Sequence, residues 1–153
     1  MPYEDSKVTV EKSQRDIKSL LARFDVQATR FTSYPAYTVL EFVRGTEAGT
    51  RTSYRITIQP KLGEKPGLST SAWDRAERQV WRVVYWWLKA KVEAIEFGLV
   101  EFEQDFLPYM LLQGADGRSR TMTEITFDHL AGRIAVPDDP FSGFRLALPE
   151  GRP

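Results

Sequence analysis

The sequence contains no cysteine and only one histidine, His129. Without cysteine the chain cannot form disulfides, thiolate nucleophiles, or zinc and iron–sulfur sites that use sulfur ligands. A single imidazole excludes a metal site built on several histidines, and a Ser-His-Asp triad would have to use His129. No G-x-S-x-G nucleophile elbow occurs. We therefore expect a structural or exposed role for His129, and a binding protein instead of an enzyme.

Cofactor motifs are missing as well. The glycines form neither G-x-x-x-x-G-K-[ST] nor G-x-G-x-x-G, so nothing indicates a nucleotide cofactor. Carboxylates are crowded in one segment, at Glu93, Glu96, Glu101, Glu103 and Asp105. Converging carboxylates can hold Mg²⁺ for phosphodiester chemistry, but no second acidic motif accompanies this segment. We therefore favour a solvated acidic surface for this segment. A metal-dependent enzyme is a distant third hypothesis for the function of the protein, and we expect no cofactor.

No charge of one sign predominates, because 21 basic residues balance 21 acidic ones. Nucleic-acid binding would therefore have to rest on a local patch. No apolar run reaches the roughly 18–20 residues that span a bilayer, and the stretch Val80–Leu88 is interrupted by Arg82. Residues 1–12 are polar and do not resemble a signal peptide. We expect a cytoplasmic protein that does not bind membranes.

What the chain does have is aromatic residues, which make up 12% of its 153 residues. This length suits one domain, and large rings suggest an aromatic core. We expect residues 1–135 to form a single α+β domain. Residues 136–153 are expected to form an irregular, proline-rich tail, docked through Phe141, Phe144 and Leu146.

Periodic patterns predict two helices. Residues 13–24 have apolar side chains at helical spacing, and Ser13 is a candidate N-cap for this helix. Residues 7–10 before it could form a short strand. Residues 72–97 form a longer, Trp-rich helix, with Ser71 as a cap and Gly98 placed to end it. The apolar face of this helix covers well over half of its circumference, which predicts the spine of the core.

Strand patterns lie between these helices. Residues 38–44 are rich in β-branched and aromatic residues, and residues 52–59 alternate, with Tyr54, Ile56 and Ile58 on one side. Residues 30–37 could add a third strand. The fold class is therefore α+β, with a small antiparallel sheet packed on the long helix and the shorter N-terminal helix. Residues 123–134 are either a short helix or a strand with a turn.

Two basic surfaces are candidates for binding nucleic acid. On the long helix, one narrow sector is expected to carry Arg75, Arg78, Arg82, Trp86 and Lys89. Arginines neutralise phosphates and an exposed tryptophan stacks on bases, a combination that holds single strands. On the outer face of the hairpin, Arg55 is expected near Arg44 and Arg51, followed by Lys61 and Lys65. For both surfaces the alternative is an ordinary polar face with salt bridges.

Several segments resemble a group of small, largely uncharacterised proteins encoded by bacteriophages and prophages. The similar pieces are Lys12-Ser13 with Ile17, Leu20 and Leu21; Arg78 and Trp81-Arg82; residues 89–96 with Gly98; and Phe102-Glu103 with residues 106–109. The resemblance implies a viral protein in the cytoplasm of a bacterial host and carries no site residue. We expect a phage accessory protein that binds single-stranded or structured nucleic acid. The alternative is one that binds and modulates a host protein, with homo-oligomerisation through residues 102–112 also possible.

Overall fold

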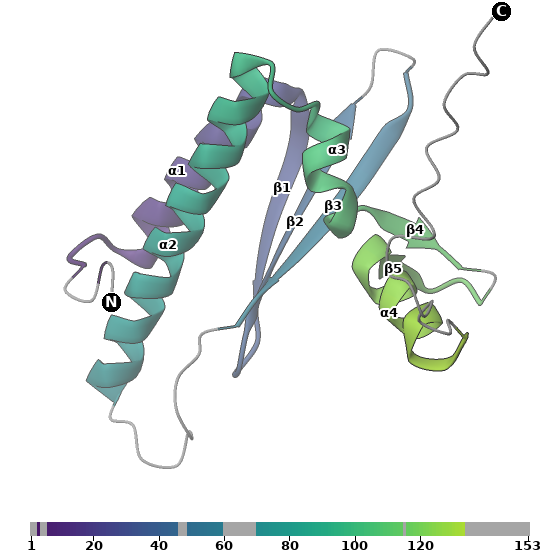
Figure 1. Ribbon diagram of the computed structural model, residues 1–153. Helices are drawn as coiled ribbons and strands as arrows, with labels where there is room; N and C mark the ends of the chain where they lie inside the picture. Colours follow the sequence, from purple (N-terminus) through teal and green to yellow (C-terminus); the bar gives the residue numbers. More distant parts are fainter. Residues whose placement is uncertain (1–2, 4–5, 46–48, 60–69, 115, 134–153) are drawn as a thin grey trace, which may run out of the picture.

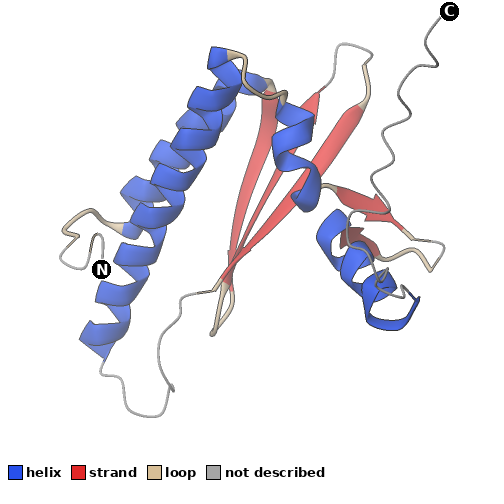
Figure 2. Ribbon diagram, in the orientation of Figure 1, coloured by secondary structure: helices blue, strands red, loops and turns tan. Residues whose placement is uncertain are grey.

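The computed structural model describes residues 3, 6–45, 49–59, 70–114 and 116–133. This part of the chain has the predicted α+β fold. Strands β1 (Val26–Ser33), β2 (Thr38–Gly45) and β3 (Arg51–Ile58) form an antiparallel sheet in the order β1-β2-β3. Helices α1 (Val10–Leu21) and α2 (Thr70–Phe97) pack side by side and cover one face of the sheet (Figure 1, Figure 2).

Alternate residues of each strand point toward the helices, and on β2 and β3 most of these residues are apolar. The buried side chains of this face are Leu40, Phe42, Tyr54, Ile56 and Ile58. The predicted alternation of β3 is therefore confirmed. The opposite face, which we call the open face, includes Glu41 of β2 and Arg55 of β3, which are paired in register.

The first helix begins earlier than the sequence predicted. Thr9 is its N-cap, and the Thr9 hydroxyl accepts a hydrogen bond from the Lys12 amide at 3.2 Å. The expected cap Ser13 is instead fully buried inside α1, and the expected strand at residues 7–10 is absent from this described segment. An earlier start brings Val10 onto the same face as Ile17, seven residues on, so that Val10 packs against the core.

The long helix ends as predicted. Gly98 has a φ of 83°, which a residue without a Cβ adopts at little cost. The Gly98 amide donates to the Ile95 carbonyl and the Leu99 amide to the Ala94 carbonyl, both at 3.0 Å. These two bonds form a Schellman motif and satisfy carbonyls that would otherwise lack a partner. Phe97 and Leu99 on either side of Gly98 are 81% and 74% exposed.

After this turn the chain returns to the sheet through α3 (Phe102–Phe106) and the 3-10 helix η3 (Leu107–Tyr109). Phe102 and Phe106 are buried and stack with ring centroids 4.5 Å apart. Both rings also meet Phe42 and Tyr54 of the sheet edge-on. Two of the apolar residues expected to form a homodimer surface therefore belong to the core.

A smaller unit follows beside β3, on the side of the sheet away from α1 (Figure 1). It consists of β4 (Leu111–Gln113), β5 (Ser119–Thr121) and α4 (Met122–Arg133). The start of α4 is capped reciprocally, since Thr121 and Glu124 each accept a bond from the other's amide. A helix is thus the outcome of the two alternatives. The His129 side chain, Lys61, Lys65 and the expected tail at 136–153 lie outside what is described. No described helix is long and apolar enough to cross a membrane.

Candidate functional site

The basic sector of α2 lies along the contact with α1 and the N-terminal segment. Arg82 is only 8% exposed; its guanidinium contacts the Asp16 carboxylate at 3.5 Å and lies 4.1 Å from the centre of the Tyr85 ring. The Arg78 Nε donates to the Ser6 carbonyl at 3.3 Å. These two arginines therefore hold neighbouring segments against α2, and Arg82 is too buried to reach a phosphate.

Asp16 joins the two helices through charge. Lys12 of α1 contacts the same carboxylate at 3.1 Å. Burial by itself would raise the pKa of Asp16, but hydrogen bonds and charge from Lys12 and Arg82 outweigh it and lower that pKa below the usual value. Asp16 therefore stays ionised and compensates the charge of the buried guanidinium.

Trp86 remains accessible, with 43% of its surface exposed. Lys89 lies 4.9 Å from the centre of the Trp86 ring and also pairs with Glu93 at 3.2 Å. The Tyr3 ring is parallel to the indole, with centroids 6.5 Å apart. Arg75 is exposed. The accessible remainder of the predicted helix surface is Arg75, Trp86 and Lys89, and one of its two cations is already paired with a carboxylate.

The predicted hairpin surface is divided between the two faces of the sheet. Arg44 lies on the helix side, where its Nε donates to the Phe24 carbonyl at 2.9 Å and its guanidinium packs 4.4 Å from the Phe102 ring centre and pairs with Glu103. The expectation that Arg44 lies near Arg55 is therefore wrong. Arg51 is exposed at the start of β3, on the same face as Arg55 by strand alternation.

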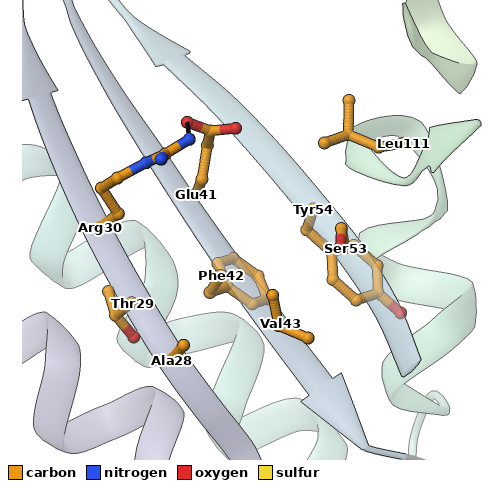
Figure 3. A pocket seen from close by; sticks show the side chains of 9 residues that line it. All are labelled: Ala28, Thr29, Arg30, Glu41, Phe42, Val43, Ser53, Tyr54 and Leu111. Carbon is orange, nitrogen blue, oxygen red and sulfur yellow. Dashed lines mark hydrogen bonds and ion pairs between the residues drawn. The ribbon is translucent and has the colours of Figure 1, made fainter. Parts of the chain in front are cut away.

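The open face carries a shallow hollow of about 340 Å³ (Figure 3). Its charged part is a row across the strands, in which Glu41 accepts from Arg30 at 2.8 Å and from Arg55 at 3.4 Å. Burial alone would raise the pKa of Glu41, but the two arginines lower it below the usual value. The remaining lining includes Ala28, Val43, Ser53 and, from β4, Leu111. Two guanidinium groups thus share one carboxylate.

A second depression, of about 430 Å³, lies between α2 and β3; we call it the α2–β3 groove. Its apolar lining residues are Ile56, Ile58, Val80, Val83, Val84, Trp87 and Tyr109. Trp87 and Tyr109 meet edge-on with centroids 5.6 Å apart, and Val83 is 41% exposed. The sequence placed Val80, Val83 and Trp87 in the core, so the groove was missed. The sequence signal that could have revealed the groove is the width of the apolar face of α2, which is larger than the sheet and α1 together can cover.

The groove lies next to the edge of the sheet. β3 is an edge strand, and the structure pairs its free side only at an isolated antiparallel bridge between Tyr54 and Met110. β2 pairs with the inner side of residues 55–58, and within the described chain no strand pairs with their outer side. As far as the described residues go, backbone donors and acceptors of an edge strand are therefore available beside an apolar depression, which is an arrangement that accepts an additional strand.

The acidic segment is accounted for by ion pairs and a cap. Four of its carboxylates form ion pairs with basic side chains: Glu93–Lys89, Glu96–Arg23, Glu103–Arg44 and Asp105–Lys91. The fifth, Glu101, forms a capping box with Gln104 at the start of α3. In the part of the chain that is described, no group of three or more potential ligands could hold a metal ion.

The described residues therefore present three surfaces that could bind a partner: the α2–β3 groove with its strand edge, the open face around Arg55, and the surface around Trp86. Only the first combines a large apolar lining with available backbone groups. No family model, curated protein or solved structure matches this chain, so the comparisons assign it to no family.

Proposed function

We propose that this chain is a protein-binding module that adds an extended segment of a partner protein to the free edge of β3, above the α2–β3 groove. The single observation that carries this proposal is the outer edge of β3, which is unpaired at residues 55–58 in the described chain and lies beside a groove lined by seven apolar side chains. Main-chain hydrogen bonds to an edge strand supply affinity, and pockets for alternate side chains supply specificity. By the resemblance to phage proteins, the partner would belong to a bacterial host.

Continuity with the existing sheet supports this proposal. The bridge between Tyr54 and Met110 already uses the same edge for antiparallel pairing, so a further strand would extend a pattern already present. A strand added at this edge would also bury apolar surface of α2 and β3 that lines the groove, including the exposed Val83. Burying apolar surface is the main driving force of most protein association.

The test is selection of peptides from a surface-displayed library on the immobilised protein. Selected peptides should lose binding to Val83→Lys, which places a charge in the groove, and keep binding to Ala90→Lys. Ala90 is an exposed residue of the same helix that does not line the groove. Equal binding to both variants would place the site elsewhere and refute the proposal.

Nucleic-acid binding is a second candidate, favoured by the exposed indole of Trp86 under Lys89 and by the exposed Arg75. A labelled single-stranded oligonucleotide should then bind with an affinity that falls steeply with salt. Trp86→Ala should weaken that binding, whereas Phe97→Ala, which removes an exposed ring at the far end of α2, should not. An unchanged affinity for Trp86→Ala, or one insensitive to salt, would refute this candidate.

A further inference from the structure

The free part of β3 separates two surfaces of different chemistry. On the side toward α2, Ile56 and Ile58 line the apolar groove. On the side of the open face, the outward residues of the strand are Arg55 and Thr57, and Arg55 contacts Glu41. A strand that pairs with this edge has its own side chains alternating between the same two sides. Its sequence must therefore satisfy both surfaces in turn.

The groove side requires apolar residues at every second position. The α2 residues that face an added strand are Val80, Val83 and Val84, with the Trp87 and Tyr109 rings at one end. A polar side chain facing the three valines would lose its hydration without gaining a hydrogen-bond partner from them. The stretch from Arg55 to Gln59 is about 17 Å of extended chain at 3.3 Å per residue, enough for two or three such positions.

The open-face side has surplus positive charge. Arg30 and Arg55 together carry two positive charges, and Glu41 is the carboxylate that both of them contact among the described residues. One positive charge therefore remains uncompensated in the row. Arg55 makes the longer of the two contacts, 3.4 Å against 2.8 Å, and it belongs to the edge strand itself. It is the guanidinium placed beside an incoming strand.

From these two sides we infer the class of partner: an extended segment in which apolar residues alternate with acidic residues. The apolar side chains enter the α2–β3 groove, and a carboxylate on the opposite side pairs with Arg55. Opposite charges directly across two paired strands stabilise the pairing, and like charges destabilise it. This inference rests on the proposed function, since it specifies the chemistry of the segment that the same edge accepts.

The experiment uses three synthetic peptides of about seven residues, the length of an ordinary strand. One alternates valine with glutamate, the second has lysine in place of glutamate, and the third has the composition of the first in an order without alternation. Binding to the full chain is measured by calorimetry at neutral pH. The Trp87 indole and the amides of residues 55–59 are followed by NMR to locate the contact.

The Val-Glu peptide should bind roughly fivefold more tightly than the Val-Lys peptide at low salt, and this preference should shrink as salt increases. The reordered peptide should bind weakly. Equal binding of the Val-Glu and Val-Lys peptides, with shifts at Trp87, would refute the inference and leave strand addition standing. Absence of binding by every peptide would refute strand addition, and the inference with it.

Two variants change the surplus charge in opposite directions. Arg55→Gln removes it and should abolish the preference for glutamate over lysine. Glu41→Gln adds to it and should enlarge that preference. Arg15→Gln, which removes the same charge from the exposed side of α1, is the matched control and should leave the preference unchanged. Equal effects of Arg55→Gln and Arg15→Gln would show that net charge alone determines the preference, and would refute the role of Arg55.

Discussion

Replacing Asp16 by asparagine is expected to lower the free energy of unfolding by about 2 kcal/mol at neutral pH. The substitution keeps the shape of the side chain and removes its charge. The Arg82 guanidinium then stays 8% exposed without that carboxylate, and its Nε already lacks a hydrogen-bond partner among the described residues. Removing one partner of a fully buried ion pair costs about 3–5 kcal/mol. The cost expected for Asp16→Asn is below this range because the Asp16 side chain is 28% exposed and its contact with Arg82 is 3.5 Å long.

The control separates the buried partner of Asp16 from the exposed one. Lys12→Met removes the i,i+4 pair on the surface of α1, whose Lys12 side chain is 58% exposed, and should cost no more than about 0.5 kcal/mol. A double-mutant cycle of Asp16→Asn with Arg82→Met should give a coupling energy of at least about 1 kcal/mol, because the two groups are in contact.

Urea denaturation followed by tryptophan fluorescence measures each of these free energies. Because the native pKa of Asp16 lies below its ordinary value of 3.8, its stabilisation is present above that value and is lost as pH falls through the native pKa. The difference between the wild type and Asp16→Asn should shrink accordingly in acid. A coupling energy near zero, with Lys12→Met as costly as Asp16→Asn, would refute the structural role assigned to Arg82.

Substitutions at three further positions test other parts of the fold. Burial, Asp74 and Glu11 raise the native pKa of Glu77, so ionisation of Glu77 destabilises the protein; Glu77→Gln should stabilise it at neutral pH, with the gain disappearing below the ordinary pKa of 4.5, and a loss of stability at neutral pH would contradict this. Phe106→Ala should cost about 3–5 kcal/mol by urea denaturation because the ring is fully buried, and Phe106→Leu distinctly less; equal costs would contradict the importance of ring stacking. Gly98→Ala should lower stability by about 1 kcal/mol through its φ of 83° alone, since no atom of the described residues lies within 4 Å of the added Cβ; no loss in a thermal melt would contradict this.

Elements that depend on neighbours in sequence were predicted well. The alternation of Tyr54, Ile56 and Ile58 specified which face of β3 is buried. Gly98 ended the long helix where its backbone freedom is needed. The start of α1 was wrong, because Thr9 and Ser13 are equally suited as caps, and only the packing of Val10 on the core distinguishes them.

The candidate site was predicted less well. Helical projection placed Arg78, Arg82 and Trp86 on one sector of α2, but it could not reveal that α1 and the N-terminal segment bind the two arginines. Strand alternation puts Arg44 on the face opposite Arg55, and the ring of Phe102 and the Glu103 carboxylate engage it there. The contacts of Arg82 with Asp16, of Arg78 with Ser6 and of Arg44 with Glu103 each join residues more than fifty positions apart along the chain.

The sequence by itself determined the two main helices, the hairpin strands β2 and β3, the buried face of β3, and the absence of cysteine chemistry, because these follow from residue type and from periodicities of two and 3.6 residues. Tertiary structure alone decided which apolar residues of α2 are covered. The three strands and α1 cover the side with Trp81, Leu88 and Val92, and among the described elements none covers the side with Val83 or pairs with the neighbouring outer edge of β3 at residues 55–58. The burial of a side chain depends on which elements pack against it in space. The periodicity of one helix shows which of its residues are apolar, but not how many of them the packed sheet and helix cover.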